Sequence, residues 1–287
     1  MRDDFAVFIL THGRAKTSIT QDTLAGAGYT GKVYFILDDE DEQAPEYKQR
    51  FGKDKIVIFN KKSYEDRIDT YDNTKDHRTI LYARNAAFDI AERLGVRYFC
   101  ELDDDYKSFE HRWGAEGKLK VCKITNMDSV FETFLNFLEN TNTTTIALAQ
   151  GGDFIGGVNG TIAKNGMWAR KAMNSFICDT KRRFWFRGTM NEDVNTYTTL
   201  GSRGLLFFTN GFCSLVQEAT QKTPGGITEL YKDNGTYTKS FYSILSMPSC
   251  VKIGRMGNSH FRIHHQIEWE NCAPKIVREE YKKNAEQ

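Results

Sequence analysis

The sequence predicts a single α/β domain, in which a mostly parallel β-sheet is flanked by helices and followed by a short C-terminal extension. Short runs rich in Val, Ile and Phe alternate with longer amphipathic stretches in the first half of the chain, a pattern typical of β-α-β units. Hydrophobic residues are 40% of the 287 residues and charged residues 27%, which is enough apolar material for a buried core. We expect this domain to cover residues 1–272.

Short apolar runs predict the strands. Five runs bounded by polar or turn residues are expected to form strands over 5–10, 33–37, 55–59, 97–102 and 145–149. A later apolar run, 204–216, predicts one or two more strands. These runs supply the expected sheet.

Two amphipathic stretches between the strands predict helices. Residues 79–94 place apolar side chains on one face, with Thr79 as N-cap and Gly95 as the stop. Residues 129–139 begin with Ser129 and Glu132 as a capping box and carry an apolar stripe that we expect in the core. We also expect a glycine-rich loop over the sheet at 151–160 and a polar loop at 223–235. A charged helix is expected at 274–284, within the C-terminal extension 273–287.

Composition excludes several classes. The six cysteines include no CxxC pair and no metal-ligand spacing, so neither a zinc site nor a disulfide framework is expected, and a reducing compartment fits best. The N-terminal apolar run is too short for a spanning helix and lacks the layout of a signal peptide, so we expect no membrane anchor. The net charge of +1 gives no strong overall field, so a polyanion would have to meet a local basic patch.

Three consecutive acids carry the most information about chemistry. Asp103, Asp104 and Asp105 follow an apolar run at the point where a central strand should end. Side chains alternate along an extended backbone, so the first and third acids can point the same way and chelate one Mn²⁺ or Mg²⁺ ion, which would bridge to a diphosphate. The alternative is a solvated acidic turn, but a strand that leads directly into the acids favours the metal site.

These features resemble the GT-A glycosyltransferases, whose DxD motif lies at the end of such a strand and holds a metal on the donor diphosphate. The resemblance implies a GT-A type, Rossmann-like fold with a nucleotide-sugar half (1–110) and an acceptor half (111–272). It also implies donor-binding roles for residues in the opening loop, at the end of the second strand, on the helix before the metal strand and within the acidic run: Thr11, His12, Gly13, Arg14, Asp38, Arg84, Asn85 and Asp104. For Asp38 and Arg84, a solvated turn and an exposed helix charge are the alternatives.

The segment Met190-Asn191-Glu192-Asp193-Val194 looks like the family's xED motif, in which an acid at a helix start faces the acceptor. The resemblance implies catalytic roles for Glu192 and Asp193, with Asp193 as the general base of an inverting transfer. Two alternatives stay open. The acids serve only the helix dipole, or a retaining mechanism uses the diphosphate oxygen as base.

A late histidine completes the metal shell in many of these enzymes. The segment SHFRIHHQ offers His264, with His260 as the substitute if the register differs. Imidazole binds Mn²⁺ well, and an extended segment would project only one of two adjacent histidines inward. A surface histidine without a ligand role is the alternative.

Cations and aromatic residues mix directly before the xED-like motif. We expect an acceptor surface here made of Arg182, Arg183 and Arg187, together with Gly151 and Gly152 of the glycine-rich loop. Arginine pairs with phosphates, and aromatic rings stack on unpaired bases. The alternative is an ordinary strand whose Phe184 and Phe186 face the core.

Within the broad family, the segments THGR, ELDDDY and GTMNEDV resemble the TET/JBP-associated glycosyltransferases of bacteriophages. That resemblance implies transfer of a hexose or pentose, with a UDP-sugar donor favoured, to a hydroxymethylpyrimidine base such as hydroxymethylcytosine in DNA. The base would have to be extruded from the duplex to react. The expected location is cytoplasmic, in the host if the protein is a phage protein.

Three other functions remain at this stage. A GT-A enzyme acting on a glycan or small molecule would keep the metal site without a DNA patch. A nucleotidyltransferase also holds Mg²⁺ with paired acids, but the single glycine in THGRAKTS fits its usual Gly-rich signature poorly. A non-catalytic binding or structural protein would retain the carboxylates, Arg84 and His264 for no purpose.

Overall fold

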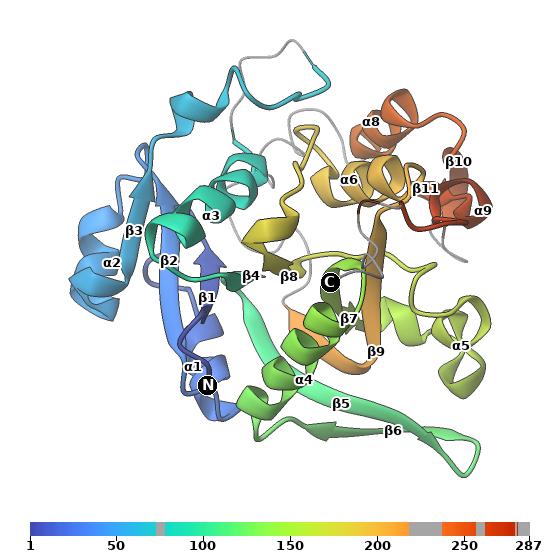
Figure 1. Cartoon of the computed structure of the whole chain (residues 1–287), viewed down its shortest axis with the longest axis horizontal. Coiled ribbons are helices and arrows are strands. Elements are labelled where there is room, and N and C mark those ends of the chain that lie inside the picture. Colours follow the sequence, from blue (N-terminus) through green and yellow to red (C-terminus); the bar gives the residue numbers. More distant parts are fainter. Residues whose placement is uncertain (73–77, 218–236, 257–261, 279, 281–287) are drawn as a thin grey trace.

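The structure is a computed structural model that describes residues 1–72, 78–217, 237–256, 262–278 and 280 (Figure 1). It confirms the predicted α/β class. A nine-stranded sheet with the order β3-β2-β1-β4-β8-β7-β9-β5-β6 forms the centre of the chain, and a separate two-stranded sheet pairs β10 with β11. The nine strands run continuously across the two halves expected from the sequence.

Most strands of the central sheet run in one direction. β1 (Phe5–Leu10), β2 (Lys32–Asp38), β3 (Ile56–Phe59) and β4 (Tyr98–Asp103) pair in parallel. β8 (Ser175–Asp179) runs against β4 and β7 (Thr143–Gln150), and β5 (Tyr106–Ala115) runs against β9 (Leu206–Gln217) and β6 (Lys118–Lys123). Since β7 and β9 are parallel, seven of the nine strands share one direction.

Helices cover both faces of the sheet. One face packs against α1 (Thr20–Gly26), α2 (Ala44–Phe51) and α4 (Met127–Asn140). The other face packs against α3 (Leu81–Arg93) and α6 (Glu192–Gly201). Strand residues such as Phe5 and Phe8 alternate between these two cores because successive side chains point to opposite faces.

The five strands predicted in the first half are confirmed within two residues at each end, and the later apolar run forms β9. The predicted core stripe of α4 is also confirmed, since Phe131, Phe134 and Leu138 are buried. The expected capping box is wrong. The helix starts two residues earlier, because the Asn126 side chain accepts a hydrogen bond from the Ser129 backbone N–H and caps the helix in its place.

Several elements differ from the prediction or were missed by it. β8 and the β5–β6 hairpin were not expected, and in Figure 1 the hairpin extends as an arm beyond the rest of the sheet. The terminal helix expected at 274–284 is wrong over 274–278, where the backbone N–H of Arg278 bonds to the Gly204 carbonyl instead of forming a helical turn. The rest of that helix and the loop at 223–235 lie wholly or mostly outside the described residues.

The C-terminal part packs beside α6 (Figure 1). It consists of α8 (Thr238–Ser246), β10 (Val251–Met256), β11 (Arg262–Ile267) and α9 (Trp269–Cys272). A short α5 (Thr161–Asn165) follows the glycine-rich loop, which folds into single 3-10 turns at Gly151–Phe154 and Gly157–Asn159. Among the described residues, no helix is long and apolar enough to cross a membrane.

Candidate functional site

Polar residues from three parallel strands meet at one edge of the sheet. β1, β2 and β4 are neighbours, and Leu10 at the end of β1 lies opposite Asp103 at the end of β4. The loop 11–14 follows β1, and Asp38 closes β2. The carboxyl edge of a parallel sheet is where open α/β folds place their ligands. The sequence prediction that these residues share one site is therefore consistent with the topology.

Arg84 of α3 is the centre of this edge. Its side chain is 1% exposed and contacts three carboxylates through three different nitrogens. Nε donates to Glu192 at 3.0 Å, one terminal nitrogen donates to Glu101 at 3.2 Å, and the other contacts Asp103 at 3.4 Å. A planar guanidinium has a fixed fork of donors, so it can join a strand to a helix in a defined geometry.

The carboxylates around Arg84 are not fully neutralised. Burial raises the pKa of Glu101 to about 8, although the charge and the hydrogen bond of Arg84 act to lower it. Burial also raises the pKa of Asp103 to about 7, with added repulsion from the other acids, including Asp105 and Asp104, against the attraction of Arg84. Buried acids that repel one another are stabilised by a bound cation.

Asp104 connects the acidic run to the opening loop. Its two carboxylate oxygens accept hydrogen bonds from Thr11, at 2.5 Å, and from Arg14, at 2.9 Å. The buried hydroxyl of Tyr47 in α2 bonds to Thr11 and accepts from the Arg14 backbone N–H. The structure thus places Asp104 as the residue of the acidic run that holds loop 11–14, in a turn that follows β4.

The rest of the opening loop is held by the segment after β2. His12 hydrogen-bonds Asp38 at 2.8 Å, and this bond raises the pKa of His12. Gly13 has a positive φ of 65° and donates its backbone N–H to Asp41 at 2.9 Å. Burial acts to raise the pKa of Asp38, but the hydrogen bond and charge of His12 bring it below its ordinary value. The structure therefore brings Thr11, His12, Gly13, Arg14 and Asp38 together, as predicted.

Asn85 has a different place. Its amide donates to the carbonyls of Leu81 and Phe186 and accepts from the Phe186 N–H, and the side chain is buried. Asn85 therefore fastens the segment before α6 to α3. Its hydrogen-bonding groups are used within the protein, so the structure does not bring it to the open edge with Arg84.

The two acids of the xED-like motif point in different directions. Glu192 accepts a hydrogen bond from Arg84, whereas Asp193 accepts one from the Val194 N–H at 2.7 Å. Burial raises the pKa of Asp193 to about 6, helped by the charge of Glu192, while the Val194 N–H, Arg84 and Lys171 act to lower it. A pKa of about 6 suits Asp193 to act as a general base near neutral pH.

The histidine segment lies beside the start of α6. Lys171 contacts Nε2 of His264 at 3.5 Å and Nε2 of His265 at 3.2 Å, and the two rings lie 4.3 Å apart. His265 is the buried member of the pair, and burial, followed by the charge of Lys171, lowers its pKa to about 2. Its other nitrogen contacts the side chain of Asn191, which adopts a positive φ of 54° at the start of α6. His260 lies outside the described residues.

The expected acceptor residues divide into two groups. Gly151 and Gly152 follow β7 at the same edge as Asp103 and are exposed, and the Arg187 backbone bonds to Thr196 of α6. Arg182 instead donates to the Thr143 carbonyl at the start of β7, which is the opposite edge of the sheet. Arg183 pairs with Asp89 on the outer side of α3 and stacks on Trp185. The structure does not bring Arg182 and Arg183 to the site, and Phe184 and Phe186 are buried in the core.

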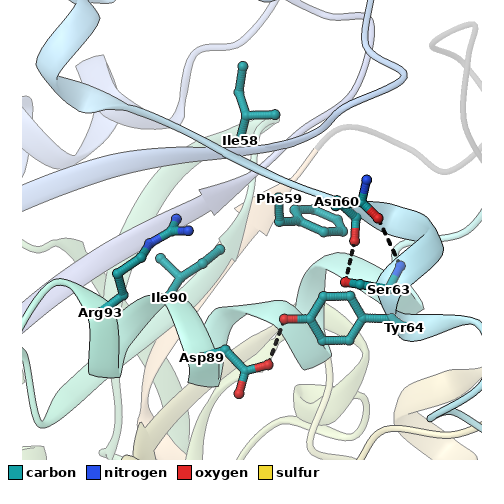
Figure 2. Close-up of a pocket in the computed structure, with 8 residues that line it drawn as sticks. All are labelled: Ile58, Phe59, Asn60, Ser63, Tyr64, Asp89, Ile90 and Arg93. Atoms are coloured by element: carbon teal, nitrogen blue, oxygen red, sulfur yellow. Dashed lines mark hydrogen bonds between the residues drawn. The ribbon is translucent and has the colours of Figure 1, made fainter.

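A surface cavity on α3 is separate from these acids. It measures about 480 Å³ and lies between α3 and the segment 58–64 (Figure 2). Figure 2 shows the Tyr64 hydroxyl directed at Asp89, whereas Arg93 lies farther along α3, at its last residue. None of the residues that contact Arg84 lines it, so we do not assign the site to this cavity.

Sequence reasoning missed three residues that shape the site. Glu101 precedes the acidic run by two positions, so strand alternation was a usable signal for its shared face with Asp103. Tyr47 and Lys171 have no motif around them and reach the site only through the tertiary fold. No sequence signal distinguishes them from other tyrosines and lysines.

Asp103 and Asp105 are the residues that could hold a divalent cation. Asp103 has one carboxylate oxygen toward Arg84, and its pKa is raised first by burial and then by the charges of neighbouring acids, which a cation would offset. In the part of the chain that the structure describes, no group of three or more His, Cys, Asp or Glu side chains is arranged to hold a metal. Mg²⁺ and similar ions commonly use one or two carboxylates plus substrate phosphates, so a two-carboxylate site suits an ion shared with a diphosphate.

Comparison with known proteins identifies relatives of the chain. A family model described as TET-Associated Glycosyltransferase matches residues 5–226. No curated protein matches the sequence significantly. A mannosyltransferase from Pyrobaculum calidifontis, solved with GDP-mannose and Mn²⁺, has a similar structure, with a TM-score of 0.51, 13% identity and coverage of 85% of this chain and 65% of that chain.

Two further solved structures are similar at lower scores. TarS from S. aureus has a TM-score of 0.46 and 10% identity, covering 85% of this chain and 40% of that chain. Glucosyl-3-phosphoglycerate synthase from Mycobacterium tuberculosis, solved with Mn²⁺ and UDP, has a TM-score of 0.44 and 9% identity, covering 92% and 87%. The chain spans less than two thirds of the mannosyltransferase and of TarS. At 13% identity, the similarity to the mannosyltransferase is one of fold alone.

Proposed function

Since the family model matches more than half of its length, the chain belongs to the TET-associated glycosyltransferase family, and we propose that it transfers a sugar from a nucleotide-sugar donor to a hydroxyl acceptor. The observation that carries this proposal is the Arg84 cluster. It joins the end of the central strand β4 to the start of α6, so that Asp103 and the xED-like motif both lie at the edge where loop 11–14 begins.

In this proposal the donor lies against loop 11–14. His12 and Asp38 contact the nucleoside, and the Arg14 guanidinium, fixed by Asp104, faces the diphosphate. Asp103 and Asp105 would hold Mn²⁺ or Mg²⁺, and such an ion when bound would offset the charge of the leaving nucleoside diphosphate. Arg84 contacts Asp103 only at 3.4 Å, which leaves this carboxylate available to the ion. A UDP-sugar is the favoured donor, and residues 1–110 form the donor half.

Asp193 acts as the base on the acceptor hydroxyl. Glu192 is held by Arg84, which leaves Asp193 as the acid of the motif available to take a proton, and its raised pKa allows both protonation states near neutrality. A base on the acceptor favours a single displacement that inverts the anomeric centre. His264 is placed near α6 but contacts Lys171, so a ligand role would require it to exchange that contact for the metal.

The proposed acceptor is a hydroxymethylpyrimidine base in phage DNA, as the family name suggests. Three of the expected residues remain for the acceptor side. Gly151 and Gly152 lie after β7 at the carboxyl edge of the sheet, and Arg187 lies next to α6. The positions of Arg182 and Arg183 away from that edge favour a second candidate, a glycan or small-molecule acceptor, because the expected basic patch is not assembled there.

Transfer to DNA can be tested directly. Nucleotide sugars are incubated with the protein, with and without Mn²⁺, in the presence of DNA that contains hydroxymethylated pyrimidines, and the nucleosides are analysed by mass. We expect Mn²⁺-dependent donor turnover and a hexose or pentose added to the base. Turnover without a modified base would replace the DNA acceptor by the second candidate, and no turnover of any donor would contradict the proposed activity. Asp105→Asn is the inactive control.

A further inference from the structure

Glu101 is an acid in the middle of β4, a central strand whose first five residues are all buried. It lies between Cys100 and Leu102 and is 0% exposed. Burying a carboxylate costs free energy unless it is paired, and replacing a buried ion pair by apolar side chains is often neutral or stabilising. The proposed roles of the acidic run use Asp103 and Asp105 but give no task to Glu101.

Among the described residues, the Glu101 side chain has one hydrogen-bond partner. One carboxylate oxygen accepts a hydrogen bond from Arg84 at 3.2 Å. The other oxygen is buried and has no hydrogen-bond partner among the described residues. Because side chains alternate along β4, Glu101 and Asp103 lie on the same face and contact two different nitrogens of the same guanidinium.

The remaining contacts of Arg84 leave it little freedom. Its Nε is directed at Glu192, and its guanidinium lies near the rings of Phe176, at 5.1 Å, and Phe186, at 5.7 Å. Asp103 accepts only a long contact of 3.4 Å. Without an acceptor at Glu101, the fork can turn toward Asp103 and form a closer pair with it.

We propose that Glu101 is a positioning residue. It fixes the orientation of Arg84, so that this arginine holds Glu192 at the start of α6 while leaving Asp103 free to bind a cation. The orientation of Arg84 is a property of the fold alone, whereas the consequence for Asp103 rests on the proposed function.

Two variants at one position separate geometry from packing. Glu101→Gln keeps an oxygen acceptor of the same reach, and Glu101→Leu keeps the volume but removes the acceptor. Thr145→Val is the matched control, because it removes another buried polar contact, to the Ile177 carbonyl, from the same sheet. Thermal unfolding of each variant establishes that it is folded. The first readout is the NMR signal of the Arg84 Nε–H group, which is bonded to Glu192 in the native protein.

The second readout is the affinity for Mn²⁺ in the presence of UDP, measured from the signal of free Mn²⁺ by electron paramagnetic resonance. We expect Glu101→Leu to shift or broaden the Arg84 Nε–H signal and to weaken Mn²⁺ binding about tenfold or more, as for other changes that disturb the partners of a metal ligand. Glu101→Gln and Thr145→Val should stay close to the native protein in both readouts.

The outcomes distinguish the inference from the proposed function. An unchanged Arg84 signal in a folded Glu101→Leu variant overturns the positioning role, whatever happens to Mn²⁺. The same change in Thr145→Val would also overturn it, because the effect would then be general to the sheet. A changed Arg84 signal in a protein that binds no Mn²⁺ supports the positioning role and contradicts the proposed metal site.

Discussion

Asp193→Asn is the perturbation that tests the catalytic assignment most directly. The change removes the proposed base while keeping the size of the side chain and an oxygen that can accept from the Val194 N–H. A positioned base contributes about a hundredfold to ten-thousandfold to the rate, so we expect kcat to fall by that factor with little change in the donor KM. The fold should survive. The pKa of Asp193 is raised in the folded state, so its ionised form is destabilising at neutral pH and its removal is not expected to lower stability.

The same assignment predicts the pH profile. A base must be ionised to accept a proton, so with a pKa of about 6 roughly nine tenths of Asp193 is active at pH 7 and about one tenth at pH 5. The rate at saturating Mn²⁺ and donor should therefore fall nearly tenfold over those two units, as the pH is lowered. It should be flat above about pH 7.

Glu192→Gln is the matched variant. After burial, the charge of Glu192 is the next largest cause of the raised pKa of Asp193, so removing it should move the acidic limb of the profile to lower pH. Gln can still accept from Arg84 Nε, which preserves the geometry. The assay is transfer rate against pH for the native protein and both variants. An acidic limb that stays in place in Glu192→Gln, or a rate retained in Asp193→Asn, would refute the assignment.

Three other predictions concern the metal, the sheet and the donor loop. Asp105→Asn should abolish transfer and Mn²⁺ binding without lowering the unfolding temperature, because the residue lies at a half-exposed strand end; measurable Mn²⁺-dependent transfer would contradict the metal assignment. Arg182→Ala should lower the free energy of unfolding by about 1–2 kcal/mol, because the hydrogen bond to the Thr143 carbonyl is lost, and should leave the transfer rate unchanged. A reduced salt dependence of DNA binding in this variant would show instead that Arg182 contacts the acceptor. Asp104→Asn should raise the donor KM about tenfold, since it weakens the hold on Arg14 and Thr11, and an unchanged KM would mean that loop 11–14 does not bind the donor.

The hydrophobic pattern of the sequence predicted the strands that are buried on both faces of the sheet. The runs of β1, β2 and β4 are apolar on both faces because helices cover both sides, and such runs are visible without any knowledge of their partners. β8 and the β5–β6 hairpin were missed for a physical reason. β8 is a five-residue run in which only Phe176, Ile177 and Cys178 are apolar, too short for a clear period. The hairpin mixes charged and aromatic residues because much of it lies outside the core.

The site divides in the same way. Residues that follow strands in a fixed order, such as Thr11, Asp38 and Asp103, are brought together by the parallel topology, and their order along the chain is enough to predict it. The sequence does not predict which of two adjacent residues takes the role. Strand register decides that His265 is buried more deeply than His264, and the bond to Arg84 decides which acid of the xED-like motif remains available as a base.

The position of Arg182 shows where chain proximity misleads. It precedes Asp193 by only eleven residues, and from the sequence both were expected beside the acceptor. β8 runs against β4, however, so the chain leaves the sheet at the edge opposite Asp103, where Asp179 pairs with Arg97 and Arg182 bonds to the start of β7. The segment 184–191 must then cross the core, through Phe184 and Phe186, to bring α6 back to the catalytic edge. The direction of one unpredicted strand therefore separates the basic segment from the acid that follows it, and any basic surface for DNA must come from other residues.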